Sequence, residues 1–140
     1  MKGQPLGLLA CGLALALTSL ASADTAEMSA ELSCRPEAAP GRVLCELKFA
    51  AREGARLTWA DALVTATPAF VKPLRSRVTP ERSLDAQAST RKLSLAFVAA
   101  QSGVGQVTVR ARAVVCRGAG GTERCHPETH DVQAEIRVGS

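Results

Sequence analysis

Four cysteines placed within runs of alternating apolar and polar residues constrain the fold of this chain more than any other feature. Cys34 ends an alternating run over residues 29–34, and Cys45 lies inside a second run over residues 43–49. Successive side chains of a strand point to opposite faces, so each run predicts a half-buried β-strand with its cysteine on the apolar face. Near the end of the chain, Cys116 closes another alternating run but falls on its outward face, and Cys125 precedes the last run.

Most of the remaining sequence also has strand character. Alternating or β-rich runs cover residues 56–67, 68–78, 92–99, 106–116 and 131–138. We expect an irregularity at Ala60-Asp61, an edge strand or crossing segment where Pro68 and Pro73 interrupt the third run, and a turn at residues 103–105. Thr79-Pro80 predicts one short helical turn. About seven strands, without a helix of ordinary length, predict an all-β, antiparallel immunoglobulin-like β-sandwich.

The N-terminus has the organisation of a secretory signal peptide. Lys2 is followed by an apolar segment over residues 6–17 and by the small residues Ala21 and Ala23 around a cleavage site. A helix of that apolar length spans about 18 Å, short of the ~30 Å of a bilayer core. We therefore expect residues 1–23 to be removed together with Cys11, which leaves residues 24–140 as a single periplasmic or extracellular β-sandwich domain. A lipid attached to Cys11 is the alternative.

Export makes disulfides the expected state of the four remaining cysteines, and three connectivities are open. Strand phase favours Cys34 with Cys45, because this pairing sets Leu32 against Leu47 and Glu31 against Lys48. A turn-forming stretch over residues 35–42 connects the two strands.

The same reasoning pairs Cys116 with Cys125 across a glycine-bearing loop. This register sets Val109 against Val132 and Arg110 against Asp131. The competing pairing is an inter-sheet bridge from Cys34 to Cys116, which requires Cys116 to point inward against its phase.

Candidate chemistry is sparse. His126 and His130 lie beside Cys125 and invite a metal hypothesis, but on an extended strand they are about 13 Å apart, so we expect no metal and no cofactor. Trp59 is expected to anchor the core. The chain has none of the common hydrolase, metalloprotease or phosphate-loop motifs. Basic residues concentrate in the middle of the chain, where we expect a solvated rim, with a partner-binding face as the alternative: Lys72, Arg75, Arg77, Arg82, Arg91 and Lys92.

Composition excludes some partners. A formal net charge of +4 is too small and too dispersed to indicate nucleic acid. Only 3% of residues are aromatic and none is Tyr, which argues against surfaces that stack bases or sugars.

From Val114 to Val138 the chain resembles the end of the N-terminal immunoglobulin-like domain of the thiol–disulfide interchange protein DsbD. The resemblance rests on Val114-Val115-Cys116, a short loop, Cys125-His126-Pro127, and a final strand. In that family the two active cysteines flank the turn between the last strands. The resemblance implies a periplasmic β-sandwich in which Cys116 and Cys125 form an exchanging pair.

Two functions follow as expectations. The first is an exported, non-enzymatic β-sandwich that binds a protein or an envelope component, with no nucleic-acid partner and no stable membrane span after signal cleavage. The alternative is a periplasmic thiol–disulfide exchange module that uses Cys116 and Cys125.

Overall fold

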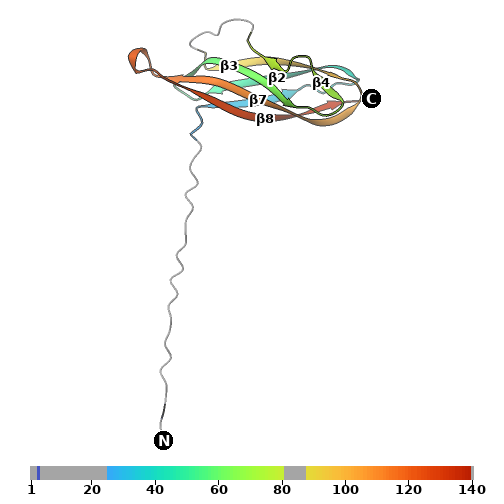
Figure 1. Cartoon of the computed structure of the whole chain (residues 1–140), viewed down its shortest axis with the longest axis horizontal. Coiled ribbons are helices and arrows are strands. Elements are labelled where there is room, and N and C mark those ends of the chain that lie inside the picture. The colour runs from blue at the N-terminus through green and yellow to red at the C-terminus, as the bar shows by residue number, and fades with distance from the viewer. Residues whose placement is uncertain (1–2, 4–24, 81–87, 140) are drawn as a thin grey trace.

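The computed structural model describes residue 3, residues 25–80 and residues 88–139, and these form an antiparallel β-sandwich (Figure 1). Apart from Gly3, the predicted signal peptide with its Cys11 lies outside the described residues, and so does Arg82. Among the described residues there are eight strands and one short 3₁₀ turn, η1 (Gly120–Thr122). The strands are β1 (Met28–Cys34), β2 (Gly41–Ala51), β3 (Ala55–Ala66), β4 (Val71–Pro73), β5 (Arg77–Val78), β6 (Thr90–Ala99), β7 (Gly103–Arg117) and β8 (Arg124–Val138).

The strands divide into two four-stranded sheets. The first sheet has the order β1-β2-β6-β4 and the second has the order β5-β3-β7-β8. The predicted all-β sandwich is confirmed, with eight strands in place of about seven. The segment after Pro68 is both an edge strand, β4, and a crossing segment, because the chain leaves β4 and joins the second sheet at β5.

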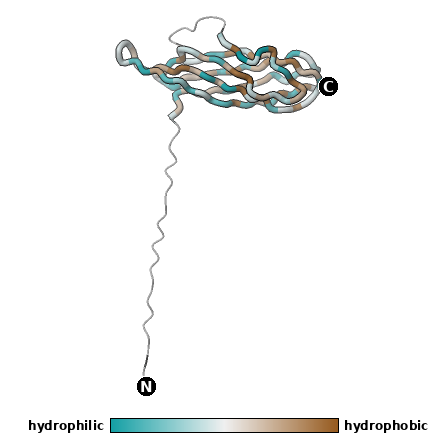
Figure 2. The backbone as a smooth tube through the Cα atoms, in the orientation of Figure 1, coloured by the Kyte–Doolittle hydropathy of each residue, from teal (hydrophilic) through white to brown (hydrophobic). Residues whose placement is uncertain are grey.

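Alternation along each strand supplies the core. Colours in Figure 2 alternate between brown and teal along the strands, as period-two burial requires. Inward side chains from both sheets meet in one cluster whose largest fully buried members are Phe49, Phe97, Leu47, Leu57, Leu95 and Ile136. The hairpin registers agree with the sequence expectation: Leu32 faces Leu47 and Val109 faces Val132.

The register of β3 contains two irregularities, neither at the expected Ala60-Asp61. One lies between Leu57 and Trp59, and the other lies between Val64 and Ala66. The first places an extra residue opposite β7, so the phase of β3 changes along its length. Leu57 and Ala60 both point into the core, whereas Trp59 points outward.

Residues 103–105, expected to be a turn, instead form the start of β7. Their glycines let other side chains approach the strand closely. A Cβ atom at Gly105 would lie 2.5 Å from Pro68 Cγ, and one at Gly103 would lie 2.8 Å from the Phe70 ring. The predicted helical turn at Thr79-Pro80 would continue into residues outside the described part of the chain.

One edge of the sandwich is closed by contacts between β1 and β8, the outer strands of the two sheets. The Glu27 amide donates hydrogen bonds to both carboxylate oxygens of Glu128, at 2.9 and 3.2 Å. Near the other end of β8, the Glu37 amide donates to the Arg137 carbonyl at 3.0 Å. These contacts hold the two sheets together where no strand joins them.

Candidate functional site

Both predicted disulfides are present. Cys34–Cys45 joins β1 to β2, and Cys116–Cys125 joins β7 to β8. Cys45 is buried in the core, whereas the second bridge lies on the outer face of the second sheet. The inter-sheet pairing of Cys34 with Cys116 is wrong, because Cys116 keeps its outward phase beside β8.

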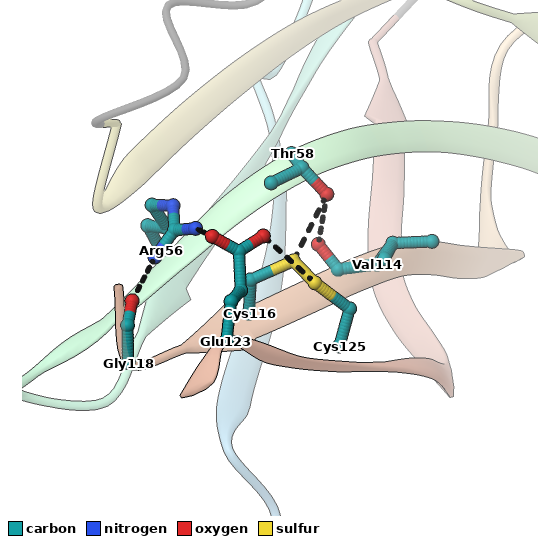
Figure 3. The surroundings of a disulfide bond; sticks show 7 residues. All are labelled: Arg56, Thr58, Val114, Cys116, Gly118, Glu123 and Cys125. Atoms are coloured by element: carbon teal, nitrogen blue, oxygen red, sulfur yellow. Dashed lines mark hydrogen bonds and ion pairs between the residues drawn. A yellow bond between two sulfur atoms is a disulfide. The ribbon is translucent and has the colours of Figure 1, made fainter. Parts of the chain in front are cut away.

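Figure 3 shows the surroundings of the second disulfide. Cys116 is buried, and its Sγ lies 3.5 Å from the Thr58 hydroxyl. Cys125 is exposed, and its Sγ lies 3.3 Å from Glu123 Oε1. Arg56 pairs with the other oxygen of Glu123 and donates a hydrogen bond to the Gly118 carbonyl at 2.9 Å. These contacts attach the β7–β8 turn to β3.

The same surroundings do not favour a reactive thiolate. The Glu123 carboxylate opposes a negative charge on the adjacent sulfur by like-charge repulsion. Arg117, which could have stabilised a thiolate, instead pairs with Glu27 at 2.6 Å. Cys116, Glu123 and Cys125 bring potential metal ligands within 4.8 Å of one another, but the two sulfurs are bonded together and offer no thiolate.

His126 and His130 lie on either side of Glu128 along β8. Each ring places its Nε2 3.7 Å from a different oxygen of the carboxylate. Both oxygens already accept hydrogen bonds from the Glu27 amide. The histidines therefore surround a carboxylate that connects β8 to the residue preceding β1.

Trp59 does not anchor the core as expected. Its side chain is 38% exposed on the outer face of the second sheet, because the irregularity before it reverses the phase of the strand. The Arg112 guanidinium lies 5.6 Å from the centre of its ring.

Asp61, also on that outer face, is fully buried. Arg112 donates to both of its oxygens at 2.8 and 2.5 Å, and Arg77 donates to one of them at 2.9 Å. The hydrogen bond to Asp61 raises the pKa of Arg112 above its ordinary value. The two arginines therefore compensate the buried charge of Asp61 and connect β3, β5 and β7 on the outer face of the second sheet.

A groove of about 800 Å³ lies on the first sheet, beside the first half of β6. Its floor comes from the outward positions of β2 and β6, and its wall comes from the segment that follows β4. We call it the β6 groove. Its described lining residues are Arg42, Leu44, Leu74, Arg75, Val78, Thr79, Pro80, Arg91, Lys92, Leu93, Ser94 and Ala96.

The β6 groove is basic and partly apolar. Arg42, Arg75, Arg91 and Lys92 line it, and none of its described lining residues is acidic. Three of these four belong to the predicted basic set, while Arg77 turns away to Asp61. Sequence reasoning missed Arg42 and the exposed Leu44 and Leu74. Leu44 carried a detectable signal, since it is an apolar residue on the polar face of an alternating strand.

Comparison with known proteins does not indicate a function for this chain. No family model and no curated protein sequence matches the chain. Among solved structures, the bacterial hydrophobin BslA is similar over 80% of this chain and 96% of its own length, with 11% identity and a TM-score of 0.34. A likeness this weak carries no inference about function. Within the described residues, we find no helix with the length and apolarity that a membrane crossing requires.

Proposed function

We propose that this protein is an exported, non-enzymatic β-sandwich that binds another protein through the β6 groove. The observation that supports this is the lining: four cationic side chains and the exposed Leu44 and Leu74 line one groove, with no carboxylate among the described lining residues. An exposed apolar patch bordered by polar residues is typical of an interaction surface. The positive charge favours an acidic partner.

The chemistry of the groove suits binding rather than catalysis. Its described charged residues are arginines and a lysine, with no histidine, cysteine or carboxylate to act as a general base or nucleophile. Export is supported separately by the two disulfides, since such bonds persist in oxidising compartments.

Site-specific photo-crosslinking in the native host tests this function. A photoreactive amino acid replaces Leu44 in the groove or, as the control, Glu31 on the exposed face of β1. We expect a discrete protein adduct from position 44 that is absent from position 31. Equal adducts from both positions, or none from position 44, would contradict the proposal.

Thiol–disulfide exchange through Cys116 and Cys125 is the second candidate. It is favoured by the exposure of Cys125 and by the resemblance of this hairpin to the DsbD domain. Thiol trapping in glutathione buffers separates the two functions. A structural bridge is typically reduced only below about −300 mV, whereas exchanging bridges are reduced at higher potentials, near −200 mV for several of them.

A further inference from the structure

The part of the β6 edge that no described strand pairs with identifies the kind of partner segment that fits the groove, an inference that rests on the proposed binding function. β4 pairs with β6 only from Val71 to Pro73, opposite Ala99 to Phe97. The last backbone contact along this edge is the hydrogen bond from the Leu74 amide to the Ala96 carbonyl, at 2.9 Å.

Beyond Ala96, the edge of β6 opens into the groove. In a strand, the N–H and C=O of one residue point to the same side, and the side alternates from residue to residue. Ser94 and Lys92 therefore direct their backbone groups the same way as Ala96, away from β2. No strand within residues 25–80 and 88–139 pairs with them on that side.

The groove also provides contacts for side chains on one face of an added strand. Leu44 lies opposite Ala96 in the register of β2 and β6, and Leu74 lies beside Ala96 on the other side. Leu44 is 37% exposed and Leu74 is 56% exposed. Together they form an apolar surface that could cover one or two aliphatic side chains.

The charges flank this apolar surface. Arg42 precedes Leu44 by two residues on the same face of β2, and Arg75 follows Leu74. Lys92 lies farther along β6, and its ammonium group is 3.3 Å from Glu46, so its charge is partly compensated. Arg42 and Arg75 are therefore the main cationic groups that can meet a ligand carboxylate.

We infer that the β6 groove takes up an extended acidic segment of another protein, which adds to β6 as a further strand. The segment hydrogen-bonds to the backbone of Ser94 and Lys92, places an aliphatic side chain on Leu44 and Leu74, and brings carboxylates to Arg42 and Arg75. Strand addition of this kind draws affinity from the main chain and specificity from alternate side chains. A lipid headgroup could use the charges but has no use for the ordered backbone edge.

Fluorescence anisotropy with a labelled synthetic octapeptide of alternating Glu and Val tests the inference on the mature protein. Ser94→Pro removes the amide that points into the groove and leaves the β2 side of β6 able to pair. Ser94→Ala is the matched control because it keeps that amide. We expect at least tenfold weaker binding by Ser94→Pro and unchanged binding by Ser94→Ala. Equal binding by the two variants would overturn the inference.

The contribution of positive charge to peptide binding is tested with Arg75→Glu. Arg124→Glu, on the exposed end of β8, is the control. We expect five- to tenfold weaker peptide binding for Arg75→Glu only, and a smaller difference in 1 M salt. If Ser94→Pro does not fold, hydrogen exchange of the wild type decides: the peptide must slow exchange of the Ser94 and Lys92 amides.

Three other outcomes would overturn the inference. These are failure of the wild type to bind the peptide, binding of phosphatidylglycerol vesicles that the peptide does not compete with, and sedimentation of a dimer held by this groove. A specific crosslink from position 44 without peptide binding would keep the proposed function and reject strand addition alone.

Discussion

Asp61 is a buried carboxylate on the outer face of the second sheet, and two arginines compensate its charge. Its side chain has no exposure, and it receives three hydrogen bonds from Arg77 and Arg112. Burial of a charge is tolerated only when partners compensate for lost hydration. The cluster also positions Arg112 over Trp59.

Replacement of Asp61 by Asn should therefore be costly. The carboxylate is lost while two guanidinium groups remain against a buried amide, and we expect about 2–4 kcal/mol of destabilisation in urea unfolding. Asp131→Asn is the control. Asp131 also receives two hydrogen bonds from one arginine, Arg110, but its side chain is 52% exposed, and exposed pairs contribute less than buried ones. Similar losses for the two variants would show that burial is not the cause.

At the scale of the elements, the β7–β8 hairpin is the main pairing in the second sheet. β7 and β8 are each 15 residues long and pair along their whole length, up to the disulfide beside the η1 turn. Figure 1 places this turn at the end of the molecule opposite the last residues of β8. Arg56 on β3 binds this turn through an ion pair with Glu123 and a hydrogen bond to the Gly118 carbonyl.

Removal of this bridge should cost stability and leave binding intact. The Cys116→Ala, Cys125→Ala double variant loses a short loop closure, and we expect about 2–3 kcal/mol less stability in urea unfolding. The β6 groove lies on the other sheet, so peptide affinity should not change. Loss of binding in this variant, under conditions where it is folded, would favour the exchange function instead.

At the scale of the whole molecule, acidic side chains connect parts of the second sheet to the segment before β1. The hydrogen bond from Arg117 lowers the pKa of Glu27 below its ordinary value, and the hydrogen bond from Arg110 does the same to Asp131. Glu27 and Arg117 are distant in sequence, so their ion pair exists only in the folded state.

These two shifts give stability a defined pH dependence. Because both pKa values are lower in the folded than in the unfolded chain, the stabilisation is fully present above the unfolded values of about 4. It is lost as the pH falls through the folded values. We expect the melting temperature to decrease below about pH 5, and to decrease less in a Glu27→Gln, Asp131→Asn double variant. An identical profile for this variant would assign the acid sensitivity to other groups.

Export is also a property of the whole chain. The apolar segment followed by Ala21 and Ala23 predicts cleavage before Asp24. Intact-mass measurement of the protein recovered outside the cytoplasm should give a chain that begins at Asp24. A diacylglyceryl mass on Cys11 would contradict this prediction.

Sequence alone predicted what depends on local periodicity. Strand phase gave the two disulfides and the hairpin registers around Leu32 and Val109, because residues close in sequence pair across short turns. The prediction for Trp59 was wrong, since one extra residue in β3 reverses the face of the side chains from Trp59 to the second irregularity after Val64. An irregularity of this kind is set by pairing with β7, about fifty residues away in the chain.

Only part of the candidate site could be predicted from the sequence, for the same reason. Arg75, Arg91 and Lys92 were recognised as a basic set, but nothing local shows that Arg42 and Leu44 lie beside them. The groove exists because β2 and β6 are neighbours in the first sheet and because the chain leaves β4 early. Alternation and cysteine phase determined the sandwich and its local pairings. Tertiary structure decided which strands became neighbours and which part of the β6 edge is unpaired among the described strands, because these depend on long-range pairing that no local pattern encodes.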